Sequence, residues 1–360
     1  MATLQAMVLM DLIARARRVA VVGLAKNTGK TETLAALLRE LEEAGATVGV
    51  TSVGRDGEAR DVIDPHIAKP RVRLWAGSVV ASADALLRAS GVAYELLEDT
   101  GVRTPLGRVL IARLRGEGTV EIAGPSAAGD VRAVADAMLA RGAELVLVDG
   151  AIDRRAASSP AVCDALVIAT GAILAERIEE VVERTRDAVD LARLPVLADP
   201  RVRALAAPGA SSVLIADEGG CAIGLHPQFA LTATAEDVAG LLRANPGASH
   251  LVVRGALCEP FLGALAAAAR GRGRECGLTV VVEDATKVFL ADRGPRWYRR
   301  AGLAIEALAS IDLRAITVNP VAPRSHSFDS ARLRELIEAA APGVPVLDVR
   351  DAVGSVAVAR

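Results

Sequence analysis

The fold of this chain is decided by the stretch Val19-Ala20-Val21-Val22-Gly23-Leu24-Ala25-Lys26-Asn27-Thr28-Gly29-Lys30-Thr31-Glu32-Thr33-Leu34. Its first residues are β-branched or small and apolar, and this run stops at Gly23. After a polar loop, leucines recur at helical spacing at Leu34, Leu37, Leu38 and Leu41. The stretch therefore predicts a strand, a loop and a helix.

The loop has the residue types that bind a polyphosphate. Backbone N–H groups and the N-terminal end of a helix bind such a dense negative charge best, and Gly29 leaves their approach open. Lys30 then reaches the β and γ phosphates, and the Thr31 hydroxyl is placed to bind Mg²⁺. We therefore predict binding of ATP with Mg²⁺. The predicted nucleotide contacts in this stretch are Gly23, Lys26, Asn27, Thr28, Gly29, Lys30, Thr31 and Glu32.

The loop is slightly longer than a strict G-x-x-x-x-G-K-[ST] loop, which requires glycine at residue 24. Here the glycine is Gly23. The pattern resembles the deviant phosphate loops of the class that contains dethiobiotin synthetase, nitrogenase iron protein and partitioning ATPases. The signature lysine of those dimeric ATPases falls one position before Lys26, so the role of Lys26 stays open. The alternative is a glycine-containing turn. However, the chain has only four lysines, Lys26, Lys30, Lys69 and Lys287, and two lie in this loop region.

Composition limits the class of protein. The chain has 360 residues, of which 52% are hydrophobic and only 2% aromatic, so its core must be aliphatic. At about 100–200 residues a domain, this length predicts about two domains. With a net charge of −2 and few aromatic side chains to stack on bases, we expect no nucleic-acid partner and no membrane partner.

Cysteine spacing and the N-terminal sequence predict a cytoplasmic protein without a metal cluster. The four cysteines, Cys163, Cys221, Cys258 and Cys276, form no C-x-x-C pair, so neither a disulfide framework nor a zinc site is expected. The N-terminal apolar residues precede the arginines, which is the reverse of a secretory signal. Residues 7–13 predict a short packing helix, and a partner-binding helix is the alternative.

Two predicted strands end in carboxylates. A strand at 47–52 is followed by Asp56 and Glu58, and the carboxyl ends of parallel strands face the ligand. Both residues are candidates for positioning metal or water, and Asp56 is assigned a catalytic role. A solvated acidic turn is the alternative.

The second of these strands, at 145–148, leads directly into Asp149. This is the form of a Walker B segment, in which the carboxylate holds Mg²⁺ directly or through water. A plain strand-end aspartate is the alternative. Asp153, Arg154 and Arg155 follow closely and are candidates for sensing the phosphate. The predicted metal ligands are Thr31 and Asp149, and the predicted catalytic residues are Lys30, Asp56 and Asp149.

The rest of the chain predicts two α/β domains. Residues 195–209 contain three prolines and show no clear period, so we expect a nucleotide-binding domain at 1–194 and a second domain at 195–360. Strands alternating with helices predict a mostly parallel sheet covered on both faces. The further expected strands are 72–75, 94–97, 108–113, 119–123, 165–170, 212–216, 250–254, 279–282 and 315–318, and the expected helices are 81–89, 126–139, 176–191, 235–243, 259–270 and 330–340.

An asparagine ends the predicted strand at 316–318. The amide of Asn319 offers a donor and an acceptor in one plane, which matches the ring nitrogen and exocyclic amine of adenine. A similar strand–asparagine segment reads the base in dethiobiotin synthetase, so Asn319 is a further predicted nucleotide contact. A turn asparagine before Pro320 is equally compatible with the sequence.

With these residues in hand, the chain resembles the P-loop subunit of the reactivase for the adenosylcobalamin-dependent lysine 5,6-aminomutase. The segments that carry the resemblance are 23–31, 100–107, 123–126, 149–154 and 317–320. The resemblance implies an ATP-driven chaperone that exchanges damaged cobalamin for fresh coenzyme. It also implies two partners, a second reactivase subunit and the aminomutase. A homo-oligomer is a further expectation.

Two other classes of function remain open. One is an ATP-dependent ligase or small-molecule kinase of the dethiobiotin synthetase type, in which the second strand edge and the region of Asp149 would hold the substrate. The other is a GTP-using protein that inserts a metal or cofactor. Such a protein would carry an N-K-x-D guanine motif, which the chain lacks.

Overall fold

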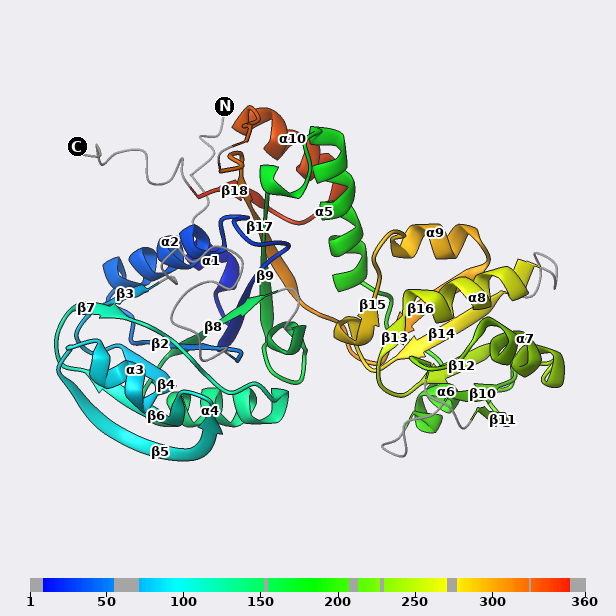
Figure 1. The fold of residues 1–360 in the computed structure, drawn as a ribbon, viewed down its shortest axis with the longest axis horizontal. Coiled ribbons are helices and arrows are strands. Elements are labelled where there is room, and N and C mark those ends of the chain that lie inside the picture. Colours follow the sequence, from blue (N-terminus) through cyan, green and yellow to red (C-terminus); the bar gives the residue numbers. More distant parts are fainter. Residues whose placement is uncertain are drawn as a thin grey trace. The chain divides into compact units, whose positions relative to one another are not determined.

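The computed structural model describes residues 9–54, 71–151, 155–206, 213–226, 230–270, 277–323 and 325–349. The chain forms two compact units, one comprising Met1–Thr185 with Asp312–Arg360 and the other Arg186–Ile311. Each unit has its own main sheet with helices, so the expected α/β class is confirmed for both (Figure 1).

The first unit is built on a nine-stranded sheet in the order β18-β17-β9-β1-β8-β2-β4-β6-β5. Neighbouring strands from β18 to β4 are parallel, whereas β6 pairs antiparallel with both β4 and β5. The sheet is therefore mixed but mostly parallel. Its strands are β1 (Arg18–Gly23), β2 (Val48–Ser52), β4 (Val79–Ala83), β5 (Tyr94–Thr104), β6 (Gly107–Leu114), β8 (Leu145–Ala151), β9 (Ala165–Gly171), β17 (Leu313–Asn319) and β18 (Val346–Asp348). A separate antiparallel pair joins β3 (Val72–Leu74) and β7 (Gly118–Val120).

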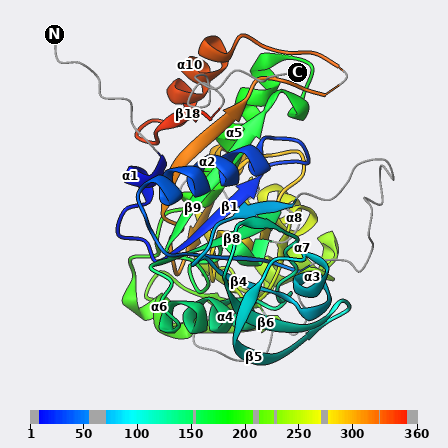
Figure 2. The ribbon, with the colours of Figure 1, turned by 90° about the vertical axis from the view of Figure 1, so that its left-hand side faces the viewer.

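Helices cover both faces of this sheet. Helix α2 (Lys30–Glu43) lies against β1 and β9 (Figure 2). Its Leu37 shares one hydrophobic cluster with Val50 of β2. Successive strand residues point to opposite faces. Accordingly, a Cβ added to the neighbouring Gly49 would lie 3.1 Å from Cε of Met138, on α4 (Ala128–Ala140). The other helices of this unit are α1 (Leu9–Ile13), α3 (Asp84–Ala89), α5 (Ile178–Ala192), which runs on into the second unit, and α10 (Ser330–Ala340).

The expected N-terminal packing helix is present as α1. Leu9 and Ile13 are buried in the same cluster as α2, and the backbone N–H of Met10 donates to Oε2 of Glu40 at 2.7 Å. Among the residues that the structure describes, no helix combines the length and the apolar character needed to cross a bilayer.

The second unit contains a five-stranded sheet in the order β11-β10-β12-β14-β16. Strands β12, β14 and β16 are parallel, and β10 is antiparallel to its two neighbours. The strands are β10 (Val213–Ala216), β11 (Ala222–His226), β12 (His250–Val253), β14 (Leu278–Val282) and β16 (Leu303–Ala307), with a separate pair β13 (Leu257–Cys258) and β15 (Val288–Phe289). The helices are α6 (Pro200–Leu205), α7 (Ala235–Ala244), α8 (Glu259–Arg270) and α9 (Pro295–Arg300).

The division into units corrects the expected boundaries of 1–194 and 195–360. Strand β17 pairs with β9 in the first sheet, with Thr317 opposite Ala169, and β18 pairs with β17. The second unit is therefore an insertion, and the chain returns to the first unit at Asp312. Hydrophobic periodicity identified β17 as a strand, but periodicity carries no information about which sheet a strand joins.

The helix expected at 81–89 begins three residues later than predicted. Residues 81–83 belong to β4, and α3 starts at Asp84. Ala81, Ser82 and Ala83 are fully buried because β4 lies between β2 and β6. Burial in the sheet outweighs the helix propensity of these small residues.

Candidate functional site

The strand, loop and helix predicted around Gly29 are present. Gly23 ends β1, Lys30 begins α2, and residues 24–29 form the segment called here the β1–α2 loop. The neighbouring strands β8 and β9 run parallel to β1, with Asp149 opposite Val21 and Ala169 opposite Gly23. The loop therefore lies at the carboxyl edge of the sheet, where parallel α/β sheets bind their ligands.

The β1–α2 loop has two residues in the left-handed region. Asn27 has φ of 63° and Gly29 has φ of 88°. Gly29 is the N-cap of α2, and no side chain caps this helix. The first N–H groups of a helix have no partner within the helix, and together with the helix dipole they attract anions. The start of α2 is thus open to an anionic ligand.

Close packing explains why glycine is needed at both ends of the loop. A Cβ at Gly23 would lie 2.6 Å from Oγ1 of Thr28, and a Cβ at Gly29 would lie 2.9 Å from Cβ of Asn319. Thr28 is itself buried, and its hydroxyl donates to the carbonyl of Ala25 at 2.9 Å. The loop is therefore folded tightly on itself and against β17.

The structure brings Lys30 and Asp149 together. Nζ of Lys30 lies 2.7 Å from Oδ1 of Asp149, and the two side chains are only 24% and 23% exposed. Oδ1 of Asp149 is buried and, among the described residues, has no hydrogen-bond partner in addition to this ion pair. A buried carboxylate oxygen with one contact retains the capacity to accept a cation or a water molecule.

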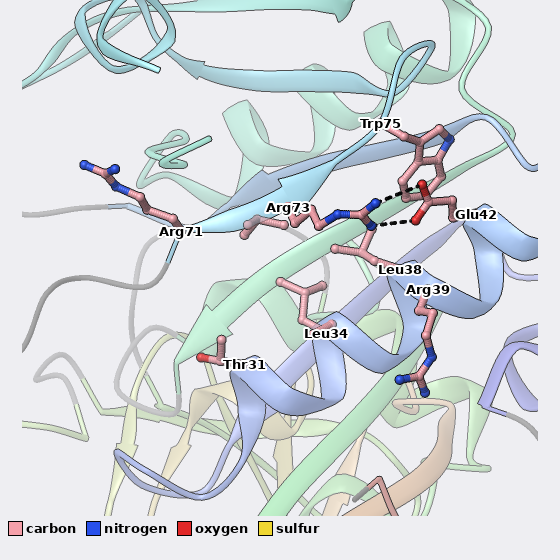
Figure 3. A pocket seen from close by; sticks show the side chains of 10 residues that line it. Thr31, Leu34, Leu38, Arg39, Glu42, Arg71, Arg73 and Trp75 are labelled. Carbon is pink, nitrogen blue, oxygen red and sulfur yellow. Dashed lines mark hydrogen bonds and ion pairs between the residues drawn. The ribbon is translucent and has the colours of Figure 1, made fainter. Parts of the chain in front are cut away.

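Thr31 and Glu32 are exposed in the first turn of α2. Thr31 lies at one end of a groove of about 190 Å³ between α2 and β3, whose floor includes Leu34 and Leu38. Figure 3 shows this groove, with the ion pair between Arg73 and Glu42 at its other end. Within the described part of the chain, the two predicted metal ligands, Thr31 and Asp149, are not hydrogen-bonded to each other.

The donor set fits a metal that is shared with a phosphate ligand. No group of three or more His, Cys, Asp or Glu side chains among the described residues could hold a metal ion. Mg²⁺ usually keeps several waters and is bound by one or two protein groups together with substrate phosphates. One hydroxyl, from Thr31, and one carboxylate, from Asp149, match the small number of ligands that a protein supplies in such a site.

Asn319 lies beside the loop, although it is distant in sequence. Its Nδ2 donates to the carbonyl of Asn27 at 3.3 Å, and its Oδ1 accepts from the N–H of Val321 at 3.2 Å. Two residues earlier, Oγ1 of Thr317 lies 2.6 Å from Oγ1 of Thr33 in α2. The sequence predicted Asn319 as a nucleotide contact, with a turn asparagine as the alternative, but did not indicate the threonine pair.

The structure gives less information about the remaining predicted residues. Lys26 is exposed on the loop. Asp56, Glu58, Asp153 and Arg154 lie outside the described residues.

A further part of the site was not found from the sequence. At the end of β2, Oγ of Ser52 donates to the carbonyl of Ile122 at 3.3 Å and accepts from the N–H of Gly124 at 3.1 Å. A Cβ at Gly124 would lie 2.0 Å from the carbonyl oxygen of Ser52. Because Ser52 pairs with Asp149 in the sheet, this segment lies next to the strand residue that carries the carboxylate. In the sequence, Gly124 appears only in segment 123–126, between an expected strand and an expected helix, as one of the segments that carry the resemblance.

The ion pair would respond to an anionic ligand. A polyanion at the start of α2 would compete with Asp149 for the Lys30 ammonium, and the released carboxylate oxygen would then be available to a cation. Both groups lie at the same edge of the sheet.

Searches against protein-family models, curated proteins and solved structures found no match for the chain.

Proposed function

We propose that the chain binds Mg·ATP at the β1–α2 loop and hydrolyses it. The observation that carries this proposal is the position of Lys30 at the uncapped start of α2, 2.7 Å from a buried carboxylate oxygen of Asp149. A lysine in this position can pair with the β and γ phosphates, and the aspartate can bind a metal ion. The two glycines that permit the loop conformation, Gly23 and Gly29, further support the assignment.

The residues present have distinct roles in this proposal. Backbone N–H groups of the loop and of the first turn of α2 hold the phosphate oxygens, and Lys30 adds a point charge. Thr31 and Asp149 would hold Mg²⁺, which when bound neutralises charge on the transferring phosphoryl group. The Lys30–Asp149 ion pair must open for both groups to act, so ligand binding and metal binding should depend on each other.

We expect Asp149→Asn to lower the rate of ATP hydrolysis more than the affinity for ATP. Charge compensation matters most as negative charge redistributes in the transition state. The rate should be measured across a range of Mg²⁺ concentrations in the wild type and the variant. Asp99→Asn is the matched control, because Asp99 also pairs with a cation, Arg108, but lies on β5 at the far edge of the sheet. An unchanged Mg²⁺ dependence in Asp149→Asn would show that another group holds the metal.

On the resemblance, we propose that the ATP cycle acts on a protein client, an adenosylcobalamin-dependent lysine aminomutase, together with a second reactivase subunit. A second unit, Arg186–Ile311, supports this because it adds surface that a nucleotide site alone does not need. Such a chaperone requires only two conformations with different client affinity. A coupling of about 1–3 kcal/mol would change that affinity by roughly 5- to 150-fold.

We expect the protein to restore activity to an aminomutase that has been inactivated during turnover. The mixture should contain this chain, the second subunit, Mg·ATP and fresh adenosylcobalamin, and recovery should be compared with a mixture that lacks ATP. Recovery no greater than in that control would refute the client assignment. ATP turnover by the chain alone that depends on a metabolite would instead support a ligase or small-molecule kinase.

A further inference from the structure

Two side chains of β17, Thr317 and Asn319, reach the nucleotide site from a distant part of the sequence. Thr317 contacts Thr33 in the first turns of α2, and Asn319 contacts Asn27 in the loop. We propose that these two residues, named here the β17 latch, hold the β1–α2 loop in the conformation that binds phosphates. Both are positioning residues. The identity of the ligand that the loop binds, Mg·ATP, rests on the proposed function.

The threonine contact fixes the carbonyl of Gly29. Oγ1 of Thr33 lies 2.9 Å from that carbonyl and 2.6 Å from Oγ1 of Thr317, and both threonines are at most 1% exposed. A hydroxyl has a single hydrogen, and a carbonyl can only accept. Thr33 therefore donates to Gly29, and Thr317 donates to Thr33. These two hydrogen bonds connect β17 to Gly29, whose φ of 88° lies in the left-handed region.

The asparagine contact fixes the carbonyl of Asn27, the other left-handed residue of the loop. A left-handed conformation is unfavourable for a residue with a Cβ and persists where the surrounding structure imposes it. β17 therefore holds both left-handed residues. Because the amide of Asn319 donates to Asn27 and accepts from Val321, its contacts favour a positioning role over the reading of an adenine base.

Thr317→Val and Asn319→Ala test the latch by ligand affinity. If the loop visits other conformations without the latch, only a fraction of the molecules can bind the ligand. The apparent affinity for the ligand is then reduced in proportion to that fraction. We expect each variant to weaken binding by about three- to tenfold. Calorimetry should compare ATP, GTP and inorganic tripolyphosphate, each with Mg²⁺. Weakening by the same factor for all three ligands supports positioning. A loss confined to ATP would assign Asn319 to base reading and overturn the latch, as would unchanged affinity for all three.

Thr170→Val is a matched control for Thr317→Val. Oγ1 of Thr170 in β9 lies 2.7 Å from Oγ1 of Thr185 in α5, which in turn donates to the carbonyl of Val181. This buried pair repeats the chemistry of the latch without contacting the loop. Removing its hydroxyl should cost similar stability and leave ligand affinity unchanged. An equal loss of affinity in Thr170→Val would mean that Thr317 acts only through general stability.

Hydrogen exchange tests the latch without any ligand. The peptides that cover residues 24–31 should exchange faster in Thr317→Val and in Asn319→Ala than in the wild type, and should be unchanged in Thr170→Val. No acceleration in either latch variant would overturn the inference. If the wild-type chain binds none of the three phosphate ligands, the proposed function fails, whereas the exchange result still decides whether β17 holds the loop.

Discussion

Lys30→Ala is expected to weaken Mg·ATP binding by about 10- to 150-fold. This range follows from about 1.5–3 kcal/mol for a charge-assisted contact between an ammonium group and phosphate oxygens. In the free protein, Lys30 pairs with Asp149, so the same substitution leaves a carboxylate with a buried oxygen unpaired. Titration calorimetry with ATP in the presence of Mg²⁺ measures the effect directly.

Two controls separate the phosphate contact from the ion pair. Lys287→Ala removes one of the few other lysines, which lies 3.5 Å from Glu283 in the second unit, and should leave ATP affinity unchanged. Asp149→Asn removes the ion pair but keeps the lysine. If loss of the pair were the whole effect, Asp149→Asn and Lys30→Ala would weaken ATP binding equally. Wild-type affinity for ATP in Lys30→Ala would contradict the proposed function.

The part of the site predicted from the sequence depends on local patterns. The apolar run before Gly23 and the leucines from Leu34 onward define the strand and the helix, so the loop between them was predictable. That Asp149 and Lys30 lie at the same edge of the sheet follows from one added rule, that parallel strands end at the same edge. Their direct contact also requires that β8 pairs with β1, which the sequence did not predict.

The remaining contacts depend on which strands become neighbours, and local sequence does not contain this information. β17 returns to the first sheet after an inserted unit, so the contacts of Thr317 with Thr33 and of Asn319 with Asn27 could not be derived from spacing. Ser52 and Gly124 meet for the same reason. Their hydrogen bonds are specific to the tertiary fold, whereas hydrophobic periodicity reports only local burial.

Gly29→Ala is expected to damage both the stability of the protein and its nucleotide site. A left-handed conformation costs an alanine about 1–2 kcal/mol, and Gly29 has φ of 88°. In addition, the new Cβ would lie 2.9 Å from Cβ of Asn319, which is closer than real Cβ atoms approach one another. The loop must therefore move away from β17, which breaks the contact between Asn319 and Asn27. We expect ATP affinity to fall by at least about tenfold, because both the backbone N–H groups and Lys30 shift together.

Gly45→Ala isolates the contribution of the clash. Gly45 follows the end of the same helix and has φ of 71°, but a Cβ there would meet nothing within 4 Å. Its substitution should cost only the left-handed conformation, about 1–2 kcal/mol in the free energy of unfolding measured with urea, and should leave ATP affinity unchanged. The excess loss of stability in Gly29→Ala over Gly45→Ala then measures the contact with β17. Equal losses of stability in the two variants, together with unchanged ATP affinity in Gly29→Ala, would mean that the loop does not need its close approach to Asn319 in order to bind the nucleotide.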